Sequence, residues 1–309
     1  MDQVIGFWNV SDDNGRRRTV GEQGFTFLVV IWALSILIML ALFFGASVSA
    51  HLKTTRNAVD NARAEALADA GVELAVLDIS AWRAAAMREP RFPRNGHSTR
   101  CSLDNGDWLA IAVEDEVGKV DLNMADERLI SAALLAAGVA EDRVARQAQR
   151  ILDYRSPANT RRPLGAEMEE DSDQVRARAK NRPLDAVEEV EQVAGMPVGL
   201  ADALRPYATI YSGQVTVDSN LAYRRLVAAL TSRGIGTGST LLSAAGSGRV
   251  FRILAQARTP QGAVFLREAV LEFVATQPGA YAFRRWRRGS GVANATVEDA
   301  PSVAGMPAC

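Results

Sequence analysis

The chain has 309 residues and carries 35 basic and 36 acidic side chains, which give a formal net charge of −1. A chain of this length forms one to three domains, and it lacks the domain-wide basic excess that is typical of nucleic-acid binders. The two cysteines, Cys101 and Cys309, exclude a dense disulfide scaffold, and no histidine near them suggests a zinc site. A single disulfide between them is the less favoured expectation, because Cys309 is the last residue and chain ends are usually mobile.

The most apolar stretch, GEQGFTFLVVIWALSILIMLALFFGA, runs from Gly21 to Ala46. No charged residue occurs between Phe25 and Ala50, and a helix of that length crosses the hydrocarbon core of a membrane. Three interpretations are open: a secretory signal that is removed, an uncut anchor, or an anchor that is cut at its start and kept.

The helical pattern continues beyond the apolar stretch, which favours the third interpretation. No proline or glycine lies between Ala46 and Ala70. Apolar residues recur three or four positions apart, at Val59, Ala62, Ala66, Ala70, Leu74 and Val76. We expect one long helix over residues 25–80, whose second half packs on a globular domain through this stripe.

The rest of the chain alternates between strand-like and helical patterns. The stretch MREPRFPRNGHSTRCSLDNGDW, residues 87–108, is rich in turn formers and is expected to be a loop. A strand beginning at Trp108, a turn near Gly118 and a second short strand follow. Helical spacing then predicts two helices broken at Gly138, the second capped by Asp142, and a further pair that turns at Gly195.

The last third returns to strand patterns. Two strands joined by the turn TPQG are expected in RVFRILAQARTPQGAVFLREAVLEFVATQPG, with a bulge near Arg267 and Glu268. AYAFRRWRRG predicts a further strand, whose arginines are interpreted as solvated charges or as a contact with an anionic partner. The small, polar residues 290–309 are expected to be disordered.

A dense acidic run is the candidate metal site. Calcium is bound by many oxygen atoms, often from flexible loops. The acidic run is therefore interpreted either as a solvated loop without a ligand or as a calcium-binding loop. The spacing does not match an EF-hand. The candidate ligands are Asp153, Glu167, Glu169, Glu170, Asp171 and Asp173.

Two helix–glycine–helix units, VDLNMADERLISAALLAAG and LDAVEEVEQVAGM, resemble helix-hairpin-helix modules, which hold DNA phosphates through backbone amides. Between Glu114 and Tyr207 there are 19 acidic and 13 basic residues, a net charge of −6. Phosphate binding needs the opposite sign. A membrane-anchored DNA-binding or uptake protein is therefore the alternative function, and a structural helical block is favoured. No pairing of a nucleophile with a base is found, so we expect no enzyme.

The start of the chain resembles the type IV pilin and pseudopilin class. The shared features are a basic leader, a glycine, a phenylalanine and an apolar helix that continues as an amphipathic one. The resemblance implies that a prepilin peptidase cuts between Gly24 and Phe25 and that the new amino terminus is methylated. Most members carry a glutamate at the fifth mature position, where this chain has Val29. A subunit without that acid suits the end of a filament, because the acid is thought to hold the amino terminus of a neighbouring subunit.

Longer stretches narrow the resemblance. Four stretches, in this order, resemble the general secretion pathway protein K family, the large minor pseudopilin of type II secretion. They are EVGKVDLNMADERLISAALLAAGV, ILDYRS, AKNRPLDAVEEVEQVAGMPVGLADALRPYATIYSG and AYAFRRWRRG. The resemblance implies an α+β fold: a long N-terminal transmembrane and spine helix packed on a small antiparallel, pilin-like sheet, with a large inserted helical domain. The resemblance to calcium-binding pseudopilins also supports calcium as the candidate cofactor.

The resemblance divides the chain into a leader (1–24), the transmembrane half of the helix (25–50), its periplasmic half (51–80), a pilin-like head (81–123 and 208–289), an inserted helical domain (124–207) and the tail (290–309). It implies a single-pass protein of the inner membrane with its C-terminal domain in the periplasm. The implied partners are other minor pseudopilins at the pseudopilus tip, the major pseudopilin and the prepilin peptidase, and no nucleic acid. The implied function is to cap the tip and help start its assembly for export of folded proteins.

Overall fold

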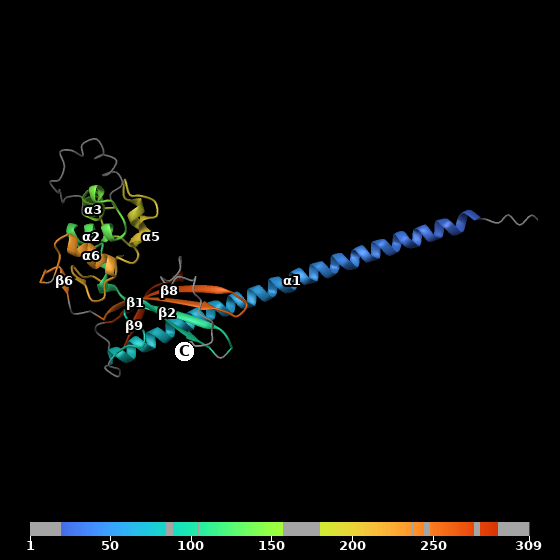
Figure 1. Ribbon diagram of the computed structural model, residues 1–309, viewed down its shortest axis with the longest axis horizontal. Helices are drawn as coiled ribbons and strands as arrows, with labels where there is room; N and C mark the ends of the chain where they lie inside the picture. Colours follow the sequence, from blue (N-terminus) through green and yellow to red (C-terminus); the bar gives the residue numbers. More distant parts are fainter. Residues whose placement is uncertain are drawn as a thin grey trace, which may run out of the picture. The chain divides into compact units, whose positions relative to one another are not determined.

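The computed structural model describes residues 20–84, 89–103, 105–156, 180–236, 238–243, 248–274, 279–289 and 309. The chain forms two compact units, which divide between Ala58 and Val59. Helix α1, Val20–Arg83, contributes to both (Figure 1). The long helix expected from the sequence is therefore confirmed.

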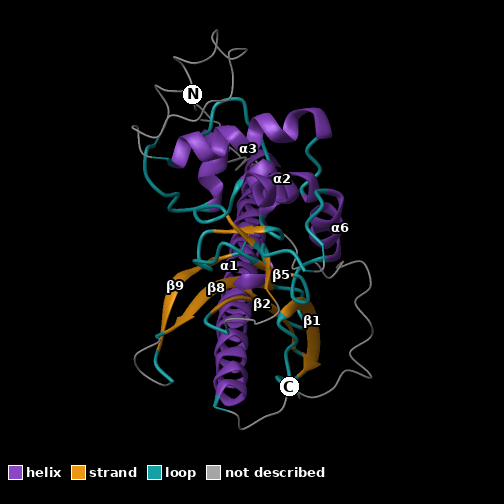
Figure 2. Ribbon diagram, turned by 90° about the vertical axis from the view of Figure 1, so that its left-hand side faces the viewer, coloured by secondary structure: helices purple, strands orange, loops and turns teal. Residues whose placement is uncertain are grey.

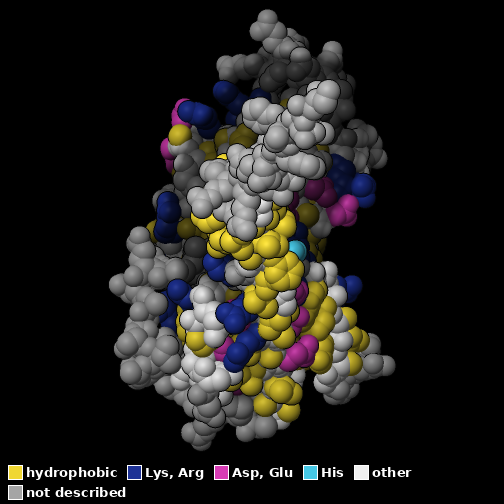
Figure 3. Space-filling view, turned by 90° about the vertical axis from the view of Figure 1, so that its right-hand side faces the viewer, with side chains coloured by type: hydrophobic (Ala, Val, Ile, Leu, Met, Phe, Trp, Pro, Cys, Tyr) yellow, Lys and Arg dark blue, Asp and Glu magenta, His cyan; other side chains and the backbone are white. Residues whose placement is uncertain are grey.

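The first unit consists of the apolar part of α1. Its large hydrophobic side chains lie at the surface, from Phe25, which is 73% exposed, to Phe44, which is 72% exposed. Figure 3 shows hydrophobic side chains gathered at the surface of the molecule in this way. The helix is long and apolar enough to cross a membrane, and no part of its most apolar window is buried within the protein. Exposure of so much apolar surface is favourable only against lipid or other protein.

The second unit contains a five-stranded antiparallel sheet. Its strands follow the order β1-β2-β7-β8-β9, so β1 and β9 form the two edges. The strands are β1 (Asn95–Ser102), β2 (Trp108–Asp115), β7 (Val250–Arg258), β8 (Val264–Phe273) and β9 (Tyr281–Arg288).

One face of the sheet packs on the second part of α1, and Figure 2 shows the strands lying across this helix. At Gly71 an added Cβ would lie 3.1 Å from the Cβ of Ala255, so glycine allows the helix to approach the sheet closely. The expected contact stripe is wrong for its first part, because Val59, Ala62, Ala66 and Ala70 are exposed. The helix instead buries the residues Ala64, Ala68, Val72, Ala75, Val76 and Ile79.

Two further expectations about the strands need correction. Residues 95–102 form strand β1, although their turn-forming composition predicts a loop. Pairing with β2 at six positions and the burial of Cys101 override local propensity. The bulge is in β9, because the pairing of β8 with β9 shifts between Val270 and Leu271. The pairing of β8 with β7 continues unbroken through Arg267 and Glu268, where the bulge was expected.

Between β2 and β7 the chain forms a group of helices around a second apolar core, which runs from Val120 to Ile235 (Figures 1 and 2). The helices are η1 (Glu116–Gly118), α2 (Glu127–Ala136), α3 (Glu141–Arg155), η2 (Val187–Gln192), α5 (Leu200–Leu204) and α6 (Arg224–Ser232). Short strand pairs complete it: β3 (Val120–Asp121) with β4 (Ala208–Thr209), and β5 (Val217–Asp218) with β6 (Leu242–Ser243).

The helices break where the sequence predicts, at Gly138 and Gly195, which have φ angles of 93° and 73°. The second pair is shorter than expected, since 187–192 is a 3-10 turn and α5 has five residues. Gly195, Pro197 and Gly199 leave too little uninterrupted chain for longer helices. Asp142 does not cap α3; it lies within the first turn, and Ala140 is the N-cap.

Cys101 and Cys309 form a disulfide, contrary to the expectation. The backbone N–H of Cys309 also donates to the carbonyl of Ser102 at 3.0 Å, and the Arg91 guanidinium donates to the Cys309 carbonyl at 2.7 Å. These contacts fix residue 309 on edge strand β1. The other residues expected to form a disordered tail, 290–308, lie outside the described residues.

Candidate functional site

The residues expected at the processing site lie near the start of α1. Gly24 has helical backbone, and Phe25 and Val29 point to the surface, with 73% and 46% of their areas exposed. Val29 therefore sits where a neighbouring helix or lipid would contact it, and no described residue of the same chain covers it.

The candidate calcium ligands are not brought together by the described residues. Asp153, on α3, accepts a hydrogen bond from the amide of Gln149 at 2.9 Å. The other five candidates, Glu167, Glu169, Glu170, Asp171 and Asp173, lie outside the described residues. Within the ranges that the structure describes, no group of three or more His, Cys, Asp or Glu side chains could hold a metal. Calcium binding stays a prediction.

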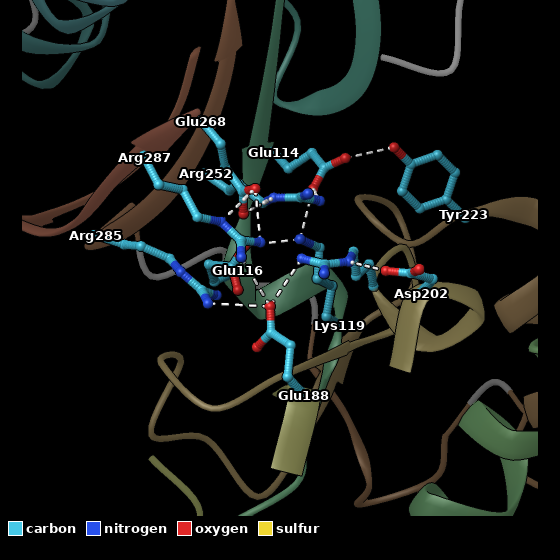
Figure 4. A network of polar contacts seen from close by, with 11 residues as sticks. Glu114, Glu116, Lys119, Glu188, Asp202, Tyr223, Arg252, Glu268, Arg285 and Arg287 are labelled. Carbon is cyan, nitrogen blue, oxygen red and sulfur yellow. Dashed lines mark hydrogen bonds and ion pairs between the residues drawn. The ribbon is translucent and has the colours of Figure 1, made fainter. Parts of the chain in front are cut away.

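A charged network that the sequence did not reveal joins the sheet to the helices (Figure 4). On the sheet side, Arg252 lies between two buried carboxylates, at 3.2 Å from Glu114 and 3.1 Å from Glu268. Lys119, just after η1, pairs with Glu114 at 2.5 Å and with Glu116 at 2.7 Å. All five side chains are at most 12% exposed.

Glu188, in η2, connects the helices to strand β9. A single oxygen of its carboxylate meets Arg205, at the end of α5, at 2.9 Å. The same oxygen meets Arg285 at 3.0 Å and Arg287 at 3.1 Å, both on β9. Arg287 also pairs with Glu268 at 2.9 Å, so the contacts form one continuous network. Three of the four arginines of β9, Arg284, Arg285 and Arg287, are thus engaged by acids of the same chain.

The network shifts the acidity of its carboxylates. Burial alone would raise the pKa of Glu114, but Lys119 and Arg252 lower it to about 2. The pKa of Glu188 is likewise lowered to about 2 against the effect of burial, by its own backbone N–H and by Arg285 and Arg205. Asp115, beside the network, differs: burial raises its pKa to about 6, because Arg94 and the backbone amides compensate incompletely.

These contacts fit a structural role. The apolar core around the helices and the core between α1 and the sheet share no described residue, and the network lies where the two parts of the unit meet. Gly118 adds a close contact there, since an added Cβ would lie 2.7 Å from the Leu221 carbonyl oxygen. A cavity of about 30 Å³, lined by Glu116, Lys119 and Glu188 among others, has room for about one water. We infer that the charges hold the helices on the sheet.

The acidity shifts predict a maximum of stability near pH 5. Asp115 binds its proton more tightly in the folded chain, so its contribution is present below its unfolded pKa of 3.8 and is lost as pH rises through about 6. Glu114 and Glu188 behave oppositely: their contribution is present above 4.5 and is lost as pH falls toward 2. Thermal unfolding of the full-length chain between pH 8 and pH 3 checks this. Asp115→Asn should flatten the limb above pH 5; an unchanged limb would contradict the assignment.

Two comparisons with known proteins bear on this arrangement. Over 77% of its length the chain superposes on the whole of a chain in the GspK-GspI-GspJ complex from enterotoxigenic Escherichia coli, with a TM-score of 0.55 and 15% identity, a likeness of fold. Residues 113–213 match the family model for type II secretion system protein K. The matched residues thus resemble a part of type II secretion system protein K, and the likeness of fold extends over most of the chain. No curated relative matches the sequence.

The part of the chain that matches the protein K family contains one half of the network. Glu114, Glu116, Lys119, Glu188 and Arg205 all lie within residues 113–213, together with α2, α3 and α5. Their partners Arg252, Glu268, Arg285 and Arg287 lie beyond it, on β7, β8 and β9. The helices within residues 113–213 are therefore held by side chains from strands that follow later in the sequence.

Proposed function

We propose that this chain is a minor pseudopilin of the protein K family, which caps the tip of the pseudopilus and helps to start its assembly. Folded proteins would then be exported across the outer membrane as the filament grows. The observation that carries the proposal is the combination of an uncovered, membrane-length helix with residues 113–213 that match the protein K model and a fold like that of a chain in the GspK-GspI-GspJ complex. The solved relative was crystallised with two other Gsp proteins, which supports minor pseudopilins as partners.

Val29 supports the position at the tip. A buried acid in lipid needs a partner, and a subunit with valine at this position offers no such hook to its neighbour. The large group of helices between β2 and β7 agrees with a subunit on which no other subunit is stacked. We propose that the chain ends the filament for both reasons.

The disulfide supports a periplasmic location for the sheet and its helices. Disulfides persist in oxidising compartments such as the bacterial periplasm and are rare in the cytosol. The bond between Cys101 and Cys309 belongs to the second unit, on the C-terminal side of the apolar helix. We propose a single-pass protein of the inner membrane with this unit in the periplasm.

Processing gives the sharpest test of the pseudopilin proposal. Mass spectrometry of the protein purified from membranes of a type II secreting cell should find N-methyl-Phe25 as the first residue. Gly24→Ala should leave the leader attached, because the proposed cut follows this glycine. Gly21→Ala, a matched change three residues earlier, should be processed normally. A first residue beyond Ala50 would show a removed signal and would refute the proposal.

The position at the tip predicts the effect of an acid at Val29. In a strain that lacks its own copy, Val29→Glu should reduce export of a type II substrate at least about tenfold. The acid would lie in the apolar helix without a partner, where a charge costs up to roughly 3 kcal/mol, and half of that already corresponds to a factor of ten. Val29→Leu, which adds no charge, should export normally. Full export with Val29→Glu would indicate a position inside the filament, where the acid has a partner.

A further inference from the structure

Strand β9, Tyr281–Arg288, is an open edge of the sheet. It pairs with β8 on one side, and no described strand pairs with its other side. The opposite edge, β1, differs because the disulfide and the N–H of Cys309 engage it at Cys101 and Ser102. An open edge carries unpaired backbone N–H and C=O groups, which can pair with a further strand.

The backbone groups that face outward can be assigned. Gly289 donates its N–H to the carbonyl of Leu266 in β8, so Gly289 faces inward. Alternate residues of a strand direct their backbone groups to opposite sides. Arg287 therefore also faces β8, and Trp286 and Arg288 direct their N–H and C=O groups to the open side.

The side chains of this edge combine aromatic and basic character. Tyr281 is 40% exposed and Trp286 is 39% exposed, and the rings of Tyr281, Phe283 and Trp286 follow one another edge to face at centroid distances of 5.7 and 4.8 Å. Arg288 is exposed beside Trp286, on the face of the sheet that also carries α1. Arg284 is the extra residue of the bulge, and its side chain is 57% exposed.

This charge selects what can pair with the edge. Arginines and bulges on edge strands usually prevent pairing between identical edges, and a second β9 would bring like charges together. A strand with carboxylates would instead be attracted to β9, because cross-strand pairs of opposite charge are favourable. The edge therefore rejects a copy of itself and accepts an acidic strand.

We propose that β9 is a docking edge for an extended acidic strand of another protein, which adds to the sheet antiparallel to β9. An apolar residue of that strand would lie opposite Trp286, and an acid two positions before it would lie opposite Arg288. The recognised pattern is thus acid, any residue, apolar residue. Backbone pairing supplies the affinity and these two side chains supply the selectivity.

The test uses two synthetic peptides and the full-length chain in detergent micelles. One peptide has the sequence Thr-Glu-Thr-Val-Thr-Glu-Thr-Val, and the second has lysine in place of each glutamate. Fluorescence anisotropy should show binding of the acidic peptide at least about tenfold tighter than that of the basic one, decreasing as salt is added. No binding of the acidic peptide at millimolar concentration, or equal binding of both, would overturn the proposal.

Variants separate backbone pairing from side-chain contact. Trp286→Pro removes an outward N–H that the β8 ladder does not use, and it should abolish binding, whereas Trp286→Ala should only weaken it. Arg288→Glu should weaken binding of the acidic peptide at least tenfold, and Arg225→Glu, an exposed change on α6, should not. Retained binding by a folded Trp286→Pro chain would overturn the proposal.

If the Trp286→Pro chain does not fold, hydrogen exchange on the unaltered chain tests the same backbone pairing. In the unaltered chain, the bound peptide should slow exchange at the amides of Trp286 and Arg288 and leave that of Arg287, already bonded to β8, unchanged. Unchanged exchange at all three would overturn the proposal. This inference does not depend on the proposed function, because processing at Phe25 and peptide binding at β9 are measured separately.

Discussion

Replacing Arg252 with methionine should lower the free energy of unfolding of the full-length chain by about 3 kcal/mol. The guanidinium lies between Glu114 and Glu268, whose side chains are 6% and 4% exposed. Without it both buried carboxylates lose a partner, and burying a charge without enough compensation is costly. Denaturant titration in detergent, followed by circular dichroism, measures the change.

Arg284→Met is the matched control for this prediction. Arg284 lies on the same sheet and pairs with Glu272, but its own side chain is 57% exposed. Exposed ion pairs contribute at most about 1 kcal/mol, so the control should change the free energy of unfolding by less than that. Equal losses in the two variants would show that burial of the network does not determine its contribution.

Removal of the disulfide should cost about 2–5 kcal/mol of stability. The bond joins residues 208 positions apart, so its loss releases a long loop in the unfolded chain. Cys101→Ser and Cys309→Ser should lower the midpoint of thermal unfolding equally, and a reducing agent should lower the unaltered chain to the same value.

The double variant separates the bond from other effects of the substitutions. Because either change alone breaks the same disulfide, the chain with both serines should be no less stable than either single variant. Additive losses would mean that the two sulfurs contribute independently. The reducing agent should leave the double variant unchanged.

The sequence predicts the elements of this fold better than their contacts. The length of α1 follows from an apolar run that continues without a break, and β7 and β8 follow from alternation around a clear turn. The buried face of α1 did not follow, because alanine occurs on both faces: Ala64 and Ala68 are buried, whereas Ala62 and Ala66 are exposed. Which face of α1 is buried depends on the size of the neighbouring residues and on how the helix packs on the sheet.

The charged network could not be predicted from local patterns. Arg252 and Glu114 are 138 positions apart, and a charged residue in a strand looks the same whether it faces solvent or another charge. One signal was present: Arg252 and Glu268 stand inside two of the most apolar strands of the chain. Charges at such positions need partners, although the sequence does not say which. The disulfide was missed because mobility of chain ends is a tendency, which a bond to β1 overrides.

The charged layer between the two apolar cores has a thermodynamic consequence. Exposing apolar surface raises the heat capacity, and exposing polar surface lowers it. Unfolding either core therefore carries a large heat-capacity change, whereas separating the helices from the sheet along Glu114, Arg252, Glu188 and Arg287 carries a small one. The free energy of that joint therefore changes almost linearly with temperature, without the curvature by which cooling weakens each core.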